Sequence, residues 1–275
     1  MIMDQTFVWR DREIAWHSRG SGPAVVFCHG TPWSSALWAP FARALADDFT
    51  VYLWDMPGYG ASSKSAEHDV DLNVQGQAFT ALLDHWGLQR PHVVAHDYGG
   101  AVTLRAHLLH KVTFGSLCLV DVVALRPWGS DYFTLVKDNA EVFAQLPAAI
   151  HRGALEAYIA GASHVGLRPT DMAMLMAPWC DDAGQPAFYR QIAQADERFT
   201  ADFEGLLGEV SAPTHIVWGE NDRWIPIDRA HRLHEAIPGS SLSLVPDAGH
   251  LVQLDQPVVI ASEIRRWLTH VAFLE

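Results

Sequence analysis

The sequence predicts an α/β fold: a mostly parallel, doubly wound sheet interrupted by an inserted helical segment. Short β-rich apolar runs alternate with longer amphipathic stretches, which is the pattern of successive βα units. Most of the strand candidates are continuously apolar, as expected for strands buried on both faces of a parallel sheet. The alternation stops between residues 124 and 212, where the composition is helical and aromatic. A chain of 275 residues is long enough for one large α/β domain with such an insertion.

The predicted strands are short runs rich in Val, Ile, Leu and aromatic residues, bounded by Gly, Pro or polar residues. In chain order they are "PAVVFC" (23–28), "FTVYLWD" (49–55), "PHVVA" (91–95), "GSLCLVDVV" (115–123), "PTHIVWG" (213–219) and "SLSLVP" (241–246).

Three of the stretches between or after these strands carry clear helix signals. Residues 34–48 begin with two serines that can cap a helix, and their apolar residues recur at helical spacing. Residues 73–87 end in Gly87, a common helix stop. Residues 255–271 begin with Asp255 as a candidate N-cap and carry Pro257 just inside the first turn.

The irregular middle of the chain is expected to be a helical insertion. Its stretches "DYFTLVKDNAEVFAQL", "HRGALEAYIAGA", "DMAMLMAPW" and "PAFYRQIAQADERF" have helical composition and many aromatic residues. The predicted boundaries are a core domain of residues 1–125 and 206–275 and an insertion of residues 126–205.

Composition narrows the classes of function. Hydrophobic residues make up 49% and charged residues 19%, which allows a sizeable core. The net charge of −13 argues against binding a phosphate backbone, so no nucleic-acid partner is expected. The N-terminal stretch "MIMDQTFVWRDRE" lacks the apolar core of a signal peptide, and no apolar run reaches the roughly 18 residues that span a membrane. We therefore expect a cytoplasmic protein that acts on a small molecule away from membranes, with its oligomeric state open, a homodimer included.

The three cysteines are widely spaced and do not form a metal-binding or disulfide pattern. Cys28 and Cys118 lie in apolar runs, where buried thiols are usually inert. Neither a metal nor an organic cofactor is expected.

The stretch "VVAHDYGGAV" (93–102) has the features of a sharp turn between a strand and a helix, with Asp97 at its centre. Such a turn needs small neighbours, and Ala95, Gly99 and Gly100 supply them. Asp97 would lie at a helix N-terminus, where backbone N–H groups stabilise a negative charge. Alone, the pattern fits a nucleophile or an ordinary helix-capping aspartate equally well.

Three further motifs favour the nucleophile. "FCHGTPWSS" follows a strand and can present the Thr31 N–H toward Asp97; together with the Tyr98 N–H it would form an oxyanion hole. "WGENDRWIP" carries Asp222 after a late strand, and "VPDAGHLVQLDQP" carries His250 in the next loop. The order Asp97, Asp222, His250 is the order nucleophile, acid, base.

These segments resemble the α/β-hydrolase superfamily, specifically its Asp-nucleophile branch of epoxide hydrolases and haloalkane dehalogenases. The resemblance covers residues 7 to 272. It implies an α/β-hydrolase fold in which the insertion is a helical cap (lid) over the active site. It also implies that Asp97 attacks a saturated carbon to give an alkyl-enzyme ester. His250 would then activate the water that hydrolyses this ester.

The acid has two candidates. Asp222 follows the late strand, where most members of the family keep the acid. Asp121 ends the strand before the insertion, where some dehalogenases place it; otherwise it is a loop cap at a strand end. We favour Asp222 and keep Asp121 as the alternative.

The favoured function is an epoxide hydrolase acting on a small to medium apolar epoxide. Such enzymes use two cap tyrosines as hydrogen-bond donors to the leaving oxygen. The alternative is a haloalkane or haloacid dehalogenase, although Thr31 and Tyr98 stand where haloalkane dehalogenases usually have Asn and Trp for the halide. A further alternative is an ester or lactone hydrolase, or a non-hydrolytic member of the fold. The predicted substrate-binding residues are aromatic: Tyr189, Tyr158, Trp33, Trp128 and Trp179.

Overall fold

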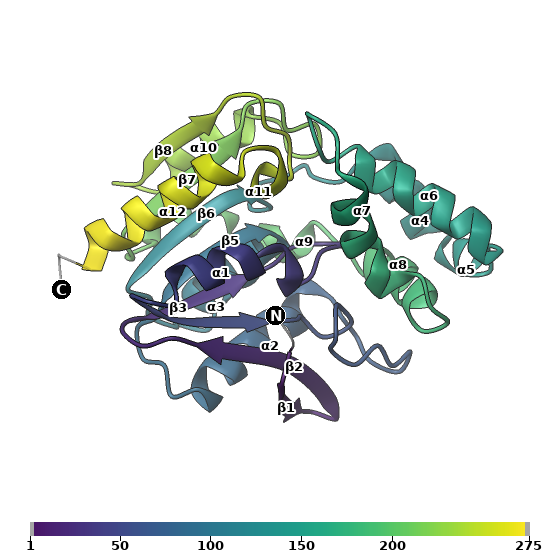
Figure 1. Cartoon of the computed structure of the whole chain (residues 1–275), viewed down its shortest axis with the longest axis horizontal. Coiled ribbons are helices and arrows are strands. Elements are labelled where there is room, and N and C mark those ends of the chain that lie inside the picture. The colour runs from purple at the N-terminus through teal and green to yellow at the C-terminus, as the bar shows by residue number, and fades with distance from the viewer. Residues whose placement is uncertain (1–2, 273–275) are drawn as a thin grey trace.

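Eight strands form one mixed sheet in the computed structural model, which describes residues 3–272 (Figure 1). The order across the sheet is β1-β2-β4-β3-β5-β6-β7-β8. The strands are β1 (Gln5–Trp9), β2 (Arg12–Arg19), β3 (Ala24–Cys28), β4 (Thr50–Trp54), β5 (His92–Asp97), β6 (Ser116–Val122), β7 (Thr214–Gly219) and β8 (Ser241–Val245).

Strands β3 to β8 are parallel, as the continuous apolar runs predicted. The hairpin of β1 and β2 was not predicted from the sequence. It joins the sheet edge through an antiparallel pairing in which Trp16 lies opposite Trp54. β1 is largely exposed, so it lacks the apolar run that marked the inner strands.

The helices outside the insertion cover both faces of the sheet, as in a doubly wound fold. They are α1 (Ala39–Leu45), α2 (Leu72–His85), α3 (Tyr98–Leu108), α10 (Asp228–Ala236), α11 (Val252–Asp255) and α12 (Pro257–Ala272).

Helices α1 and α12 pack on one face of the sheet, and α2, α3 and α10 belong to the core on the other face (Figure 1). In α12 the residues Ile260, Ile264 and Leu268 are buried, four residues apart, so one stripe of the helix meets the sheet. The predicted start at Asp255 lies two residues early, because a separate short helix, α11, ends there and α12 begins at Pro257.

The chain between β6 and β7 is helical, as its composition predicted, and most of it projects beyond one end of the sheet (Figure 1, teal to green). We call residues 126–205 the insertion. Its helices are α4 (Asp131–Asp138), α5 (Ala140–Ala144), α6 (Ala148–Ala160), α7 (Pro169–Met176), α8 (Gly184–Ala193) and α9 (Arg198–Glu204). Short 3-10 turns occur at η1 (Ser35–Leu37), η2 (Ala177–Trp179) and η3 (Leu207–Glu209).

Polar contacts tie the insertion to the core. The Trp179 indole N–H donates to the Pro32 carbonyl at 2.7 Å. The guanidinium of Arg105 on α3 forms an ion pair with Asp202 on α9 at 2.8 Å. The first of these contacts places the insertion beside the loop that follows the carboxyl end of β3, the edge at which a parallel sheet carries its ligand site.

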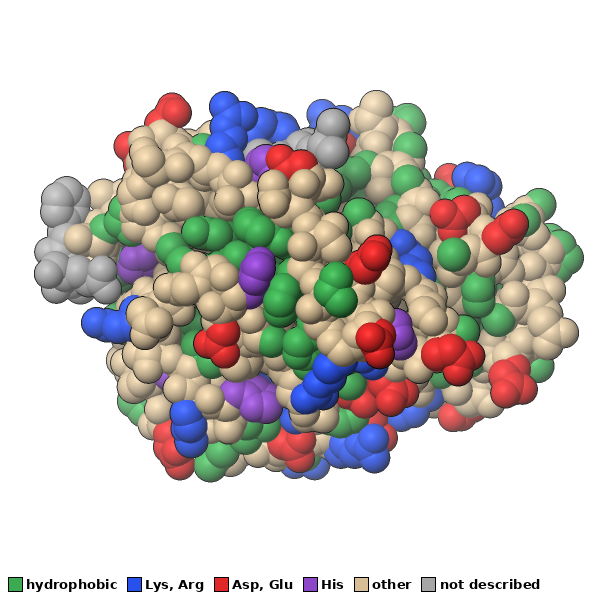
Figure 2. All heavy atoms as spheres, turned by 90° about the horizontal axis from the view of Figure 1, so that it is seen from below, with side chains coloured by type: hydrophobic (Ala, Val, Ile, Leu, Met, Phe, Trp, Pro, Cys, Tyr) green, Lys and Arg blue, Asp and Glu red, His purple; other side chains and the backbone are tan. Residues whose placement is uncertain are grey.

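The surface carries both signs of charge. Figure 2 shows Lys and Arg in small groups among acidic side chains on one face, rather than in one continuous basic patch. Among the described helices, none combines the length and apolarity that a bilayer-spanning helix requires.

Candidate active site

The turn between β5 and α3 holds Asp97 in a conformation that most side chains avoid, with φ of 50° and ψ of −121°. Its neighbours have to be glycine. A Cβ on Gly30 would lie 2.3 Å from the Asp97 Cβ, and a Cβ on Gly99 would lie 2.5 Å from the Cys28 carbonyl oxygen. The glycines around Asp97 therefore allow the strained backbone at this position, and backbone strain of this kind is common at functional sites.

The two oxygens of the Asp97 carboxylate have different surroundings. Oδ1 accepts a hydrogen bond from the Thr31 N–H at 2.6 Å. Oδ2 lies 3.3 Å from His250 Nε2. The side chain is buried at the N-terminus of α3, whose dipole favours a negative charge. One oxygen is thus held by the backbone, and the other faces the imidazole.

His250 is held through its Nδ1, its ring face and its backbone carbonyl. Its Nδ1 lies 2.8 Å from Asp222 Oδ2. Asp222 in turn accepts hydrogen bonds through Oδ1 from the N–H groups of Trp224 and Ile225, at 2.7 and 2.9 Å. The Trp224 ring stacks on the imidazole, with 5.1 Å between ring centroids. His96 Nε2 donates to the His250 carbonyl at 2.9 Å, which anchors the loop.

The proton of this cluster belongs on His250. Burial alone would lower the pKa of His250, but the carboxylates of Asp222 and Asp97 outweigh it and hold the pKa well above its usual value. Burial, followed by the charge of His250, lowers the pKa of His96 to about 3. His96 is therefore a neutral anchor rather than a second base.

The other candidate acid, Asp121, does not hydrogen-bond to the imidazole. Its Oδ1 accepts from the Gly219 N–H at 2.8 Å, and the side chain is fully buried. Burial, and then the charge of Asp222, raise the pKa of Asp121 well above its usual value. Of the two carboxyls proposed from the sequence, the structure brings Asp222 to the His250 ring.

A small cavity of about 40 Å³ opens beside Asp97. It is largely aromatic and draws residues from the core and the insertion. The lining residues are Thr31, Asp97, Tyr98, Val123, Trp128, Gly129, Ser130, Phe133, Tyr158, Trp224 and Ile225.

Two phenols on this cavity are suited to donate hydrogen bonds. The Tyr98 hydroxyl is buried and has no hydrogen-bond partner among residues 3–272. The Tyr158 ring stacks on Trp224, with 4.5 Å between ring centroids. Burial raises the pKa of both phenols well above its usual value, and the charge of Asp97 adds to this. Both hydroxyls therefore keep their protons through alkaline pH.

Three of the predicted substrate-binding residues do not line this cavity. The Tyr189 hydroxyl pairs with His151 Nδ1 at 2.8 Å, inside the insertion. The indole N–H of Trp179 donates to the Pro32 carbonyl and is not free for a substrate. Trp33 stacks on Trp224, with 5.6 Å between ring centroids. The placement of these three at the substrate was inferred from composition and family spacing, neither of which shows which way a side chain faces.

Tyr158 and Trp128, the other two predicted substrate-binding residues, do line the cavity. Trp128 contributes its ring, since its indole N–H donates to Thr200 Oγ1 at 2.9 Å. A halide in the cavity would not meet a free N–H from this residue.

Sequence reasoning missed Gln191, Trp224 and Phe133. Gln191 Oε1 accepts from Thr31 Oγ1 at 2.6 Å, so it joins α8 to the loop that holds Asp97. It lies two residues after Tyr189, and side chains two residues apart on a helix point about 200° apart. Both are buried, but Gln191 faces Thr31 while the Tyr189 hydroxyl meets His151 inside the insertion. Trp224 stands two residues after Asp222 in "WGENDRWIP", a position that the motif itself could have drawn attention to.

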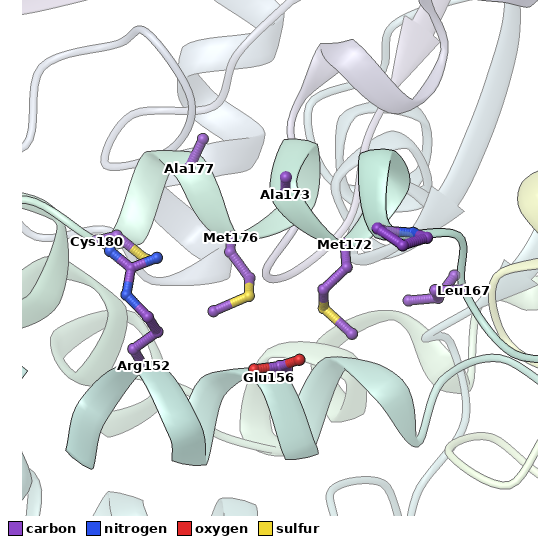
Figure 3. Close-up of a pocket in the computed structure, with 9 residues that line it drawn as sticks. Arg152, Glu156, Leu167, Met172, Ala173, Met176, Ala177 and Cys180 are labelled. Carbon is purple, nitrogen blue, oxygen red and sulfur yellow. The ribbon is translucent and has the colours of Figure 1, made fainter. Parts of the chain in front are cut away.

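A larger pocket, of about 530 Å³, lies within the insertion between α6 and α7 (Figure 3). Arg152 and Glu156 face Met172 and Met176 across it. It shares no lining residue with the Asp97 cavity. Within residues 3–272, no group of three or more His, Cys, Asp or Glu side chains is arranged to hold a metal ion.

The fold and the Asp97 turn together define the class of protein. Residues 23–257 match the family model described as alpha/beta hydrolase fold, and the chain belongs to this family.

Solved structures and curated relatives agree with this class. An alpha/beta hydrolase fold protein from Burkholderia ambifaria is 42% identical, with a TM-score of 0.93 over 96% of this chain and 97% of that chain. A 2-hydroxy-6-oxononadienedioate/2-hydroxy-6-oxononatrienedioate hydrolase of Pseudomonas putida is 27% identical over 88% of this chain and 87% of its own length. The haloalkane dehalogenase DatA from Agrobacterium tumefaciens C58 is 21% identical, with a TM-score of 0.84 over 97% of this chain and 96% of that chain, which shows a shared fold.

Proposed function

We propose that this α/β hydrolase uses Asp97 as a nucleophile toward a saturated carbon, and that its substrate is a small apolar epoxide. The observation that carries the proposal is the asymmetric setting of the Asp97 carboxylate. Oδ1 is held by the Thr31 N–H, while Oδ2 faces His250 Nε2 across 3.3 Å. An ionised carboxylate needs no base to attack carbon, whereas a serine at the same turn would first have to lose a proton.

The first step forms an ester between Asp97 Oδ2 and the attacked carbon, and the C–O bond of the epoxide breaks. The negative charge develops on an oxygen that stays attached to the substrate and needs a hydrogen-bond donor. Tyr98 and Tyr158 line the cavity and remain protonated, so we assign them as the donors. Tyr98 takes the place that the sequence interpretation gave to Tyr189.

The second step hydrolyses the ester. The oxygen of the opened epoxide takes up one proton, and His250 gives up the proton that it carries in the free protein. His250, now neutral and oriented by Asp222, removes a proton from a water that attacks the Asp97 carbonyl carbon. The carbonyl oxygen of this ester is Oδ1, which already accepts the Thr31 N–H. That N–H, with the first N–H of α3 at Tyr98, stabilises the tetrahedral oxyanion.

The cavity beside Asp97 has to widen before an epoxide can bind. At about 40 Å³, the cavity beside Asp97 is little larger than the space of one water molecule. A second hollow, of about 310 Å³, shares Trp128, Gly129 and Phe133 with it. We infer that a substrate enters past these shared residues and displaces them, so the insertion acts as a cap.

A haloalkane dehalogenase is the second candidate. The observation that favours it is the same pair of phenol donors, which also suits a departing halide. Against it, the indole N–H groups of Trp128 and Trp179 are already bonded to Thr200 and Pro32.

The test of the nucleophile is transfer of solvent oxygen into the protein. Wild type is cycled with styrene oxide in ¹⁸O-water, and its peptides are then analysed by mass spectrometry. Label is expected in the peptide that contains Asp97, because water attacks the side-chain carbonyl carbon. Label in the product alone would exclude the covalent route. Asp97→Ala is the control and should show neither turnover nor label.

The substrate class is tested with a panel of epoxides, haloalkanes, haloacids and p-nitrophenyl esters. Epoxide turnover without halide release supports the proposal, and ready bromide release from a 1-bromoalkane replaces it with the dehalogenase. Turnover of the aryl ester alone would overturn the alkyl-transfer route for both.

A further inference from the structure

Asp121 is a buried carboxyl that the proposed reaction does not use. It lies near the end of β6 with a φ of 44°, a left-handed conformation that is uncommon for residues other than glycine. The pairing of β5 with β6 is irregular here: His96 lies opposite Val120, and Asp97 lies opposite Val122. The bulge takes Asp121 out of the regular ladder, and such bulges often re-aim a side chain next to an active site.

The surroundings of Asp121 offer it no positive partner of its own. Oδ1 accepts one hydrogen bond, from the Gly219 N–H, and Oδ2 has no N–H or hydroxyl donor within the described chain. The Gly219 N–H that binds Asp121 belongs to the turn that carries Asp222, and the ionisable groups that act on Asp121 are the Asp222 carboxyl and the His250 imidazole. Two carboxyl groups in direct contact form a hydrogen bond only if one of them carries a proton.

The hydrogen-bond count places that proton on Asp121. Asp222 already accepts three hydrogen bonds, from the N–H groups of Trp224 and Ile225 and from His250 Nδ1. A carboxylate has about four acceptor positions, so one remains. Each donor favours the charged form of the carboxyl that it binds, and Asp121 accepts only one, so Asp121 is the site at which a proton costs least. The raised pKa of Asp121 agrees with this count.

We propose that Asp121 is held as a neutral carboxylic acid that donates a hydrogen bond to the Asp222 carboxylate and thereby positions it against His250. The positioning role rests on the function proposed above. Asp121 Oδ1 holds the turn that carries Asp222. The Gly219 N–H donates to this oxygen, and the Gly219 carbonyl accepts the Asp222 N–H at 3.2 Å. One side chain thus fixes both the backbone and the carboxylate of the acid.

The protonation state can be tested without any substrate. The infrared difference spectrum of wild type minus Asp121→Asn at pH 7 should contain the carbonyl stretch of one buried protonated carboxyl. The absence of that band would overturn the inference, whether or not the enzyme turns over an epoxide. Circular dichroism of both proteins confirms that the comparison is between folded chains.

The positioning role is tested by kinetics on the substrate identified by the panel. Asn at position 121 can donate its amide to Asp222 and accept from Gly219, so Asp121→Asn should keep kcat within about threefold. Asp121→Leu, of similar size but without a donor, should lose about tenfold or more in kcat, with KM little changed.

Other outcomes would overturn the role. If Asp121→Asn loses as much as Asp222→Asn, the ionised form of Asp121 is required. If folded Asp121→Leu retains the wild-type kcat and its pH profile, Asp121 does not position the acid. Failure of every substrate would count against the proposed function and leave the infrared result as the measure of protonation.

Discussion

Replacing Asp222 by Asn should separate the two chemical steps. Asp222 Oδ1 accepts two backbone N–H groups, from Trp224 and Ile225, and only Oδ2 faces the imidazole. In the variant the amide oxygen keeps the two backbone bonds, so the loop stays in place. The amide nitrogen then meets His250 Nδ1 and requires it to be an acceptor. The ring proton therefore moves to Nε2, the nitrogen that has to accept a proton from water.

The size of the effect follows from this change of tautomer. The same isosteric replacement in a Ser-His-Asp triad lowers kcat about 10⁴-fold, roughly 5.5 kcal/mol of transition-state stabilisation. We expect a loss of about 10³- to 10⁴-fold in hydrolysis of the ester, for the same reason. Attack by Asp97 requires no base, so formation of the ester should be slowed far less.

The assay is a rapid-quench single turnover with styrene oxide, followed by mass spectrometry of the peptide that contains Asp97. The ester should accumulate in Asp222→Asn and in His250→Gln, while wild type shows little of it. Steady-state turnover of Asp222→Asn within tenfold of wild type would refute the assignment of the acid. A folded variant that neither forms the ester nor turns over would refute the separation of steps.

The cavity and the buried imidazole each give a further prediction. Tyr158→Phe should lower kcat on the epoxide more than tenfold, which corresponds to about 1.4 kcal/mol or more. Tyr189→Phe removes a phenol that is bonded to His151 and should leave kcat nearly unchanged. Equal losses in the two variants would contradict the placement of the donors. The pKa of His250 is higher in the folded chain than its unfolded value of about 6.5, so its stabilisation is full below about pH 6.5 and is lost as pH rises through the folded pKa. The free energy of unfolding of wild type relative to His250→Gln, from urea titrations between pH 6 and 10, should therefore fall with rising pH, and a constant difference would contradict the raised pKa.

The parts of the site that were predicted from the sequence are those fixed by the local backbone. The turn at Asp97 needs glycine at position 99 and at the facing position 30, and both glycines stand in the motifs from which the turn was predicted. The inner strands were predicted because burial on both faces leaves a continuous apolar run. The edge hairpin was missed because β1 is exposed on most of its length and lacks that run.

The rest depends on the direction in which side chains point across the fold. Tyr189 and Gln191 are two residues apart on one helix, and the sequence does not show which of them faces Thr31. Asp121 lies near the end of β6 and Asp222 follows the adjacent strand β7, so both were plausible acids. The choice between them depends on a bulge in β6 and on three donors around Asp222, which are properties of the folded chain.

The buried charges of the site also suggest when His250 becomes a base. In the free protein two carboxylates, Asp222 and Asp97, hold a proton on the imidazole. In the proposed mechanism, attack on the substrate converts Asp97 into a neutral ester, so one of these two carboxylates loses its charge. The imidazole then releases its proton more readily, at the stage of the cycle in which a base is needed for water. When hydrolysis restores the Asp97 carboxylate, the proton is again favoured on His250. If Asp97 is the nucleophile that we propose, it therefore controls the protonation of its own base through an oxygen that lies 3.3 Å from His250 Nε2.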